Sequence, residues 1–338
     1  MVKRLAGTLI ILAFLIGAGA SRAQDKPSRP LDVLNVSYAS VTGSRIPLWI
    51  AKDAGLFEKY GLNVNLVVIA AGNMAIGALM GGDVEILGAP GTTSMVSAAK
   101  GLPIAIIGTF GPGAWKLVAN PSIASVQDLR GKTIGTSRPG TTIDFSVRRA
   151  LVKLGLVPGK DVNILATGVA ESIKRVFIMQ QGNIDATLVS PDNLYEAESR
   201  GVKLSVLADL RDLGIFTSAS DLSAKRDFIK THRSRVRAFL AAYCEAIRLG
   251  KTHKAVALAS FRKHMRESDP TRLEVLYKNY VEDALPAKPY PMEDVIQADI
   301  ENLSSTMPEM RGKQPADFID KTLLSELEAE GFFARLYR

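Results

Sequence analysis

Short apolar runs alternate with segments of helical periodicity between residues 33 and 207. Apolar positions at 143–154 recur three and four residues apart, and Gly155 follows as a stop signal for a helix. The runs with the length and composition of strands form two groups, at 33–38, 64–69, 84–87 and 104–109, and at 133–136, 162–165, 184–189 and 204–207. This alternation predicts βαβ units and an α/β fold whose sheets are mostly parallel and flanked by helices.

The two groups of strands resemble each other at an offset of 100 residues. The sequence GDVEI at 82–86 corresponds to GNIDA at 182–186, and a turn with a proline follows each, at Pro90 and Pro191. Exact identities are few, so two unrelated α/β segments could also match this well by chance. If the repeat is real, the chain forms two lobes of similar build that face each other.

After about Asp209 the pattern changes to helices alone. A long amphipathic helix is predicted at 227–249, and its row of lysines and arginines is typical of a solvated face. Shorter helices are predicted at 255–265, 271–284, 292–303 and 318–327. We expect this helical tail to pack on the first lobe. Lobe 1 is then discontinuous, with residues 31–118 plus 213–335, lobe 2 has residues 119–212, and the links lie near 111–121 and 209–220.

Residues 1–23 have the composition of a cleaved signal peptide. Lys3 and Arg4 precede the apolar run 5–20, and Ser21 and Ala23 place small residues at the −3 and −1 positions of a cleavage after Ala23. The alternative is a membrane anchor, because the run is nearly long enough to span a bilayer. No cysteine lies near the cleavage point, so we expect a periplasmic protein that is not a lipoprotein.

Composition narrows the function classes. The formal charge of +8 is modest and its basic residues are scattered, which argues against nucleic-acid binding. The single cysteine, Cys244, lies on the apolar stripe of a predicted helix, and we interpret it as a buried thiol rather than a nucleophile. No group of His, Cys and carboxylate residues has metal-ligand spacing. We therefore expect a monomer without metal or cofactor.

Four segments, in order, carry a family resemblance: PLWIAKDAGLFEKYGL at 47–62, ALMGGDVE at 78–85, DLRGKTIG at 128–135 and QGNIDA at 181–186. They resemble ABC-transporter substrate-binding proteins of the nitrate, sulfonate and bicarbonate class, which is also grouped with binders of thiamine-pyrimidine precursors. The resemblance covers residues 31–239. It implies a two-lobe periplasmic-binding-protein fold of type II-like organisation, in which two crossover strands join the lobes. It also implies a small-molecule ligand in the cleft and an ABC permease of the inner membrane as transient partner, without fixing the ligand.

Ligands of α/β lobes bind beyond the carboxyl ends of parallel strands, where loops lead into helix N-termini. Four such loops stand out, at 40–45, 89–93, 137–142 and 190–193, and we expect them to converge from both lobes. Trp115, in the Gly-rich link, is a further candidate as an aromatic wall. The candidate ligand-binding residues in the loops are Thr42, Gly43, Ser44, Pro90, Gly91, Thr92, Gly140, Thr141, Thr142, Ser190 and Asp192.

Several of these residues also have a purely structural interpretation. Thr141 fits the capping box of the next helix, and Trp115 can serve ordinary packing. Asp192 favours a ligand with an amine or hydroxyl, whereas Arg45 and Arg138 favour an anion. The chemistry of the ligand therefore stays open at the level of the sequence.

Three function classes fit the pattern. The first is a binding protein that closes about a hinge when its ligand contacts both lobes, and the second is a periplasmic sensor built in the same way. The third is an enzyme on this fold, because the related thiamine-pyrimidine synthases of fungi consume an internal histidine and rely on a cysteine-rich segment. Here His232, His253 and His264 all fall in the helical tail, so we expect a binding protein, no enzyme and no catalytic residues.

Overall fold

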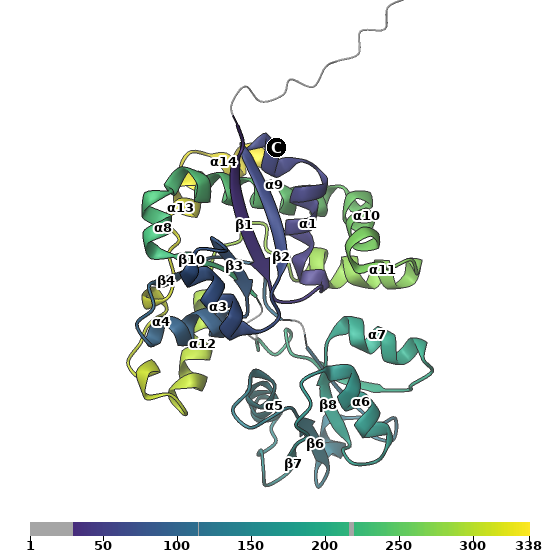
Figure 1. Cartoon of the computed structure of the whole chain (residues 1–338). Helices are drawn as coiled ribbons and strands as arrows, with labels where there is room; N and C mark the ends of the chain where they lie inside the picture. Colours follow the sequence, from purple (N-terminus) through teal and green to yellow (C-terminus); the bar gives the residue numbers. More distant parts are fainter. Residues whose placement is uncertain (1–29, 114, 216–219) are drawn as a thin grey trace, which may run out of the picture. The chain divides into compact units, whose positions relative to one another are not determined.

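Two five-stranded sheets organise the chain, and the computed structural model describes residues 30–113, 115–215 and 220–338 (Figure 1). The predicted signal peptide lies outside the described residues. The first sheet has the strand order β2-β1-β3-β10-β4, with β1 Asp32–Tyr38, β2 Leu62–Val68, β3 Ile86–Ala89, β4 Ile104–Thr109 and β10 Asp221–Lys225. The second has the order β7-β6-β8-β5-β9, with β5 Lys116–Ala119, β6 Thr133–Thr136, β7 Asn163–Ala166, β8 Ala186–Val189 and β9 Ser205–Asp209.

The two sheets have the same topology. In strand order, β2, β1, β3, β10 and β4 of the first correspond to β7, β6, β8, β5 and β9 of the second. Strands β3 and β8 start exactly one repeat apart, at Ile86 and Ala186, and helices α4 (Gly91–Ala99) and α7 (Pro191–Ser199) follow at the same offset. The predicted internal repeat is therefore confirmed.

Each sheet contains one antiparallel strand. β10 pairs antiparallel with β3 and β4, and β5 pairs antiparallel with β8 and β9, whereas β1 is parallel to its neighbours. The chain leaves the first sheet after β4 to enter β5 of the second, and leaves β9 to re-enter the first sheet at β10. β5 and β10 are therefore the two crossover strands that the family resemblance implies.

Both crossover strands were missed in the sequence. The expectation that only helices follow Asp209 is wrong, because β10 lies between β3 and β4. Its sequence, DLSAK, has no clear apolar run, although four of its five residues are buried. One polar member, Ser223, is satisfied inside the protein by a 2.8 Å hydrogen bond between its hydroxyl and that of Ser94. A short central strand with satisfied polar groups lacks the hydrophobic alternation by which strands are recognised.

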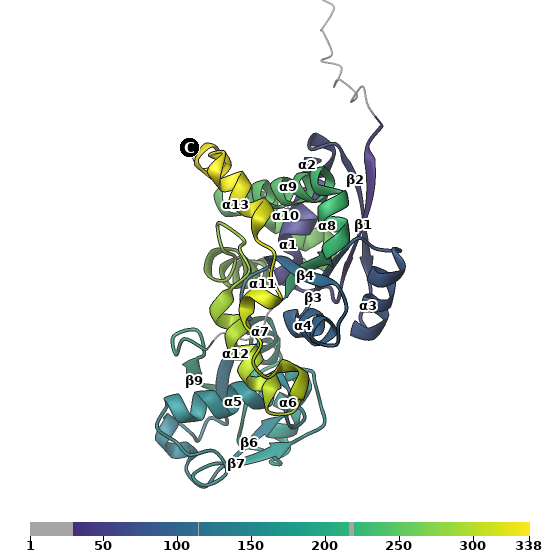
Figure 2. The ribbon, with the colours of Figure 1, turned by 90° about the vertical axis from the view of Figure 1, so that its left-hand side faces the viewer.

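The remaining helices flank these sheets (Figure 2). They are α1 Ile46–Asp53, α2 Leu56–Lys59, α3 Gly72–Gly81, α5 Thr142–Lys153, α6 Ser172–Gln180, α8 Arg226–Thr231, α9 Arg233–Thr252, α10 Lys254–Met265, α11 Pro270–Tyr277, α12 Glu293–Ser304, α13 Thr322–Ala329 and α14 Phe332–Leu336. The predicted long helix at 227–249 is thus two helices, which meet at His232. Directly after α11 comes a π-helix, η3 (Lys278–Asp283). In the described part of the chain, no helix combines the length and the apolar character that a membrane span requires.

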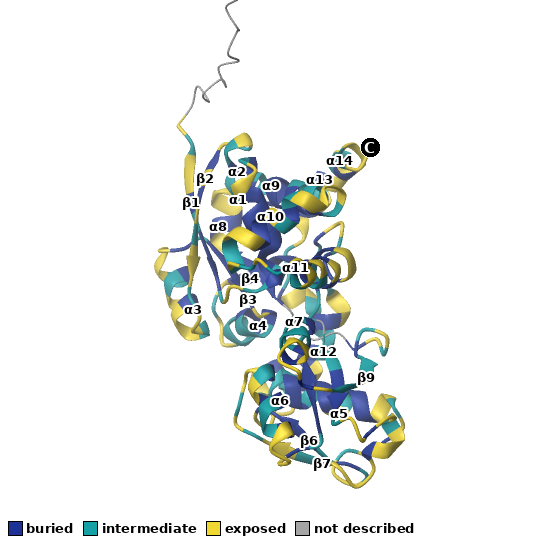
Figure 3. Ribbon diagram, turned by 90° about the vertical axis from the view of Figure 1, so that its right-hand side faces the viewer, coloured by how far each residue is buried: buried dark blue, intermediate teal, exposed yellow. Residues whose placement is uncertain are grey.

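The main hydrophobic core joins the first sheet to the helical tail. Helix α9 buries one face (Figure 3), and its Phe239 stacks on Phe57 of α2 with ring centroids 5.7 Å apart. Leu34 and Val36 of β1 belong to the same buried cluster. The tail therefore packs on the first sheet as expected. The residue limits of the two lobes stay predictions, although β5 pairs with the second sheet from Lys116 onward, within the segment assigned to lobe 1.

Candidate ligand-binding site

A cavity of about 610 Å³, here called the central cavity, lies where loops of both sheets meet. Thr42 and Ser44 follow β1, and Pro90 follows β3, so these side chains come from the first sheet. Thr142 at the start of α5 and Ser190 at the N-cap of α7 come from the second sheet. The loops lie at the carboxyl ends of parallel strands, because that is where a βαβ connection turns from strand to helix.

The predicted residues divide between two cavities. Thr42, Ser44, Pro90, Trp115, Thr142, Ser190 and Asp192 line the central cavity. Thr92, Gly140, Thr141 and again Thr142 line a second cavity of about 640 Å³, here called the side cavity. Gly43 and Gly91 are buried and line neither. Contact of any of these residues with a ligand stays a prediction.

Gly43 has a structural reason of its own. A Cβ atom at this position would lie 2.1 Å from Cδ2 of Tyr280, far inside van der Waals contact. The glycine therefore lets the ring of Tyr280, on the π-helix η3, pack directly on the loop after β1. Tyr280 in turn lines the central cavity.

Thr141 caps helix α5. Its Oγ1 accepts a hydrogen bond from the backbone N–H of Asp144 at 3.4 Å and donates one to the carbonyl of Arg138 at 2.7 Å. The Asp144 carboxylate accepts the N–H of Gly140 at 3.1 Å. The capping interpretation is thus confirmed, and Thr141 lines the side cavity at the same time.

Arg45 lies buried behind the wall of the central cavity, with 2% of its surface exposed. Its Nη2 donates to Oγ of Ser220 at 2.5 Å, and its guanidinium carbon lies 4.5 Å from the ring centroid of Phe110. Both Ser220 and Phe110 line the cavity. Among the described residues, Nε and Nη1 of Arg45 have no hydrogen-bond partner. Burial lowers the pKa of Arg45 to about 10, which leaves it cationic at neutral pH.

The other charged groups around the central cavity are largely engaged. Oδ1 of Asp192 accepts a hydrogen bond from the hydroxyl of Tyr280 at 2.7 Å, which links α7 of the second sheet to η3. Glu171, at the N-cap of α6, forms an ion pair with Lys174 at 2.9 Å. Arg138 is exposed and lines neither cavity, so of the two arginines only Arg45 adjoins the site.

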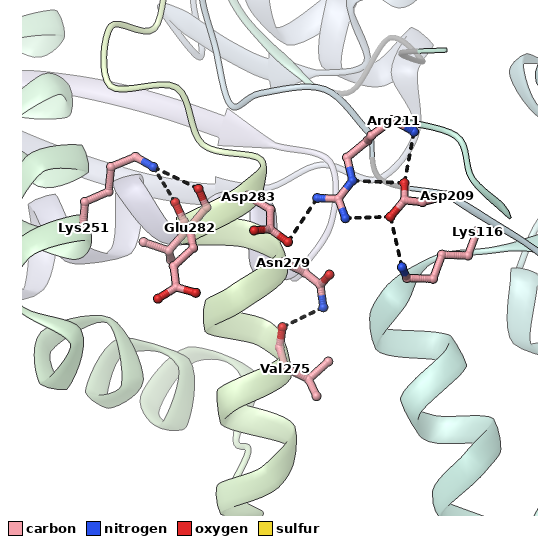
Figure 4. Close-up of polar contacts among 9 residues, drawn as sticks. Lys116, Asp209, Arg211, Lys251, Val275, Asn279, Glu282 and Asp283 are labelled. Atoms are coloured by element: carbon pink, nitrogen blue, oxygen red, sulfur yellow. Dashed lines mark hydrogen bonds and ion pairs between the residues drawn. The ribbon is translucent and has the colours of Figure 1, made fainter. Parts of the chain in front are cut away.

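A charged cluster joins the two crossover segments (Figure 4). Asp209, at the end of β9, lies 3.0 Å from Nζ of Lys116 on β5 and 2.8 Å from Nη2 of Arg211. Partial burial alone raises the pKa of Asp209, but hydrogen bonds from Arg211 and Lys116 outweigh it and lower the pKa to about 2. Arg211 also reaches Asp283 of η3 at 3.4 Å.

Several cavity residues had not been singled out in the sequence. Ser172 follows β7 and starts α6, so the strand-to-helix rule that selected the other loops would have found it. Phe110 and Ser220 belong to the crossover segments, whose strands were missed. Tyr280 lies far along the chain in the helical tail, where no local signal marks it.

Comparisons with known proteins agree with this architecture. The periplasmic aliphatic sulphonate binding protein SsuA of Escherichia coli is 20% identical, with a TM-score of 0.65 over 87% of this chain and 99% of that chain. A ligand-binding component of an ABC-type import system from Staphylococcus aureus is 14% identical, with a TM-score of 0.68 over 87% and 98%. The periplasmic nitrate-binding protein NrtA of Synechocystis PCC 6803 is 13% identical, with a TM-score of 0.63 over 91% of each chain.

Likeness at this level of identity establishes the fold, which is that of the periplasmic binding proteins. A search of curated proteins gives no match. The family model described as NMT1/THI5 like matches residues 43–253, which contain both crossover strands and most residues that line the central cavity, but not Val41, Thr42, Tyr280 and Ala284. This match spans more than half of the sequence, and the chain therefore belongs to the NMT1/THI5-like family.

Proposed function

We propose that this chain is the substrate-binding component of an ABC import system and holds a small polar organic solute in the central cavity. The observation that carries the proposal is the composition of that cavity, whose walls come from strand-to-helix loops of both sheets. A solute there touches both halves of the molecule at once, so its binding energy favours closure. The similar structures, a ligand-binding component of an ABC-type import system and a sulphonate-binding protein, support the same class.

The cavity favours a solute with an anionic or hydrogen-bond-accepting group. Ser172 and Ser190 stand at the starts of α6 and α7, where helix N-termini favour negative charge. The cation of Arg45 lies directly behind Ser220, with donors unused. Asp192, the residue that argued for an amine, already accepts the hydroxyl of Tyr280. Phe110 and the neighbouring aromatic side chains can cover the organic part of the solute.

Hinge closure is the mechanism that we propose for capture. The two crossover segments are the direct covalent links between the sheets, and the Asp209 cluster holds their second-sheet ends together. Rotation about such links changes few packed contacts within either sheet. The closed form then presents both lobe surfaces to a permease, which is the partner that this function requires.

We further propose that the protein acts in the periplasm after removal of residues 1–23. The apolar run and the small residues before the cleavage point support this, as does the periplasmic location of the similar proteins SsuA and NrtA. A sensor would use the same cavity. Measurement of solute uptake in cells that lack the gene distinguishes the two roles, and loss of uptake would support transport.

A binding role is favoured over the fungal enzyme's chemistry by the location of the histidines. His232 and His253 lie at the junctions of α8, α9 and α10, and His264 forms a contact with Asp53 on α1, with 3.0 Å between Nε2 and Oδ2. None of the three lines the central or the side cavity. A histidine consumed as a substrate has to reach the site of reaction.

The proposal is tested by thermal unfolding of ligand-free protein, prepared by unfolding and refolding. The screen contains sulfonates, nitrate, bicarbonate, aromatic acids, pyrimidines and amino acids. A true ligand at a hundredfold excess over Kd stabilises the native state by about 2.7 kcal/mol and raises Tm by about 5 °C or more.

Ser44→Trp fills the central cavity and should abolish the shift, while Ser234→Trp, the same change on the exposed face of α9, should preserve it. Equal shifts in the two variants would place the ligand elsewhere. No shift with any compound would contradict the proposed class of solute.

A further inference from the structure

The side cavity differs in character from the central one. Its walls come from α3, α4, the start of α5 and the end of α12. Among the described residues that line it, none carries a charge. The side chains of Ile76, Val96 and Leu303 give it apolar surface, and four threonines add methyl and hydroxyl groups.

The apolar lining residues lie at the edges of cores rather than inside them. On α3, Ala75 and Leu79 are buried in a small cluster, while Ile76 is half-buried at its margin. On α12, Ile296 and Ile300 pack against Met95 of α4, while Leu303 lies at the margin of that cluster. Apolar side chains that border a cavity of this size gain free energy when an apolar group covers them.

The two cavities share one residue. Thr142, the first residue of α5, lines both. The cavities therefore adjoin at Thr142, and a solute whose polar group lies among Ser44, Ser190 and Ser220 would have to pass this residue to enter the side cavity. The combined space exceeds what a simple oxyanion needs.

We propose that the side cavity is a second subsite, which binds an uncharged, mainly apolar chain of the same solute whose polar group occupies the central cavity. This inference rests on the proposed function and narrows its substrate class to amphiphilic organic molecules. The polar end contributes orientation through the hydroxyls and Arg45. The apolar end contributes affinity in proportion to the surface that it buries.

The experiment uses three series of unbranched compounds with methyl to octyl chains, one each of alkanesulfonates, carboxylates and primary amines. Affinity of the ligand-free full-length protein is measured by calorimetry. We expect the preferred series to gain about fourfold in affinity per added methylene until the side cavity is full.

Two variants narrow the side cavity from two different helices, Val96→Phe on α4 and Ile76→Phe on α3. Each should bind the methyl compound like the wild type and lose the gain with chain length. Val152→Phe, at a position of α5 that is 65% exposed, is the matched control and should keep the gain. Unfolding curves without ligand identify a variant that fails to fold, and the other wall then supplies the test.

The outcomes separate the two proposals. Binding of short compounds without any gain from longer chains, or a gain that survives in both cavity variants, overturns the second subsite and leaves the proposed function standing. A gain that only the cavity variants lose, with no measurable binding of the methyl compounds, supports the side cavity while contradicting the assigned head-group site. Absence of binding in all three series overturns the second subsite, and the thermal-unfolding screen then decides the proposed function separately.

Discussion

Arg45 and Asp221 are two buried groups of opposite charge that lie close enough to interact electrostatically. Asp221, the first residue of β10, is 8% exposed, and burial raises its pKa to about 6 despite a hydrogen bond with Thr109 and the nearby charge of Arg45. Nothing in the sequence around Asp221 shows that it is buried, because burial follows from the insertion of β10 between β3 and β4.

We predict that Asp221→Asn changes the pH dependence of stability. The pKa of Asp221 is higher in the folded state, about 6 against an ordinary 3.8, so its contribution to stability is complete below 3.8 and is lost as pH rises through 6. The free energy of unfolding of the variant, measured relative to the wild type, should therefore increase by up to about 3 kcal/mol from pH 4 to pH 7. Urea unfolding at each pH measures the difference.

Asp128→Asn supplies a control of opposite sign. Hydrogen bonds from the side chain and backbone of Ser125 lower the pKa of this exposed carboxyl below 3.8. The stabilising contribution of Asp128 is complete above pH 3.8 and is lost as pH falls below it. The free energy of unfolding of this variant, relative to the wild type, should therefore decrease as pH rises toward 3.8. A pH-independent difference for Asp221→Asn would show that its carboxyl is not held in a buried site.

At the scale of elements, the N-terminus of α5 combines two roles. Thr141 closes the first turn of the helix, and the same loop forms a wall of the side cavity. The sequence predicted the cap, since the motif is local, but it did not separate the four loops into two cavities. That division depends on how α4 and α12 lie relative to α5, which no local pattern encodes.

Thr141→Ala should reduce the free energy of unfolding by about 1 kcal/mol, because the first turn loses an acceptor for a backbone N–H. Thr141→Ser keeps the hydroxyl and should remain within a few tenths of a kcal/mol of the wild type. Urea unfolding of both variants at pH 7 gives the comparison. Equal losses in the two would mean that the methyl group, not the cap, stabilises this turn.

At the scale of the whole molecule, three polar contacts join the second sheet and its helices to the segment of α11 and η3. Tyr280 donates to Asp192, Tyr195 donates to Asp269, and Arg211 pairs with Asp283. The first two contacts involve residues of α7. The third involves Arg211, which lies in the crossover segment after β9 (Figure 4). Together they tie the second sheet and its helices to the segment of α11 and η3.

We predict that Tyr280→Phe shifts the molecule toward an open form. The lost hydrogen bond to a carboxylate is worth about 1.4 kcal/mol, which corresponds to about a tenfold change in the opening equilibrium. X-ray scattering should show a larger radius of gyration for the ligand-free variant. Tyr277→Phe is the matched control, because the hydroxyl of Tyr277 donates to the carbonyls of Gly250 and Lys251 on α9, away from the second sheet. The prediction fails if the two variants scatter alike.

The sequence alone determined the features that depend on neighbours along the chain. Hydrophobic periodicity predicted eight of the ten strands in the described part of the chain, and it predicted the helical tail. Glycines, prolines and hydroxyls after strands predicted the loops of the site. The 100-residue offset predicted two similar halves. These signals are local because strand, turn and cap each span only a few residues.

The tertiary structure decided what depends on residues far apart. β5 and β10 are strands because partners on both sides satisfy their backbones, although their own sequences are short and partly polar. Only a glycine at position 43 leaves room for the ring of Tyr280, which lies more than two hundred residues away in the sequence. Arg45 is buried because Phe110 and Ser220 pack against it. Burial and charge pairing arise only when distant segments meet, and they set the chemistry of the site.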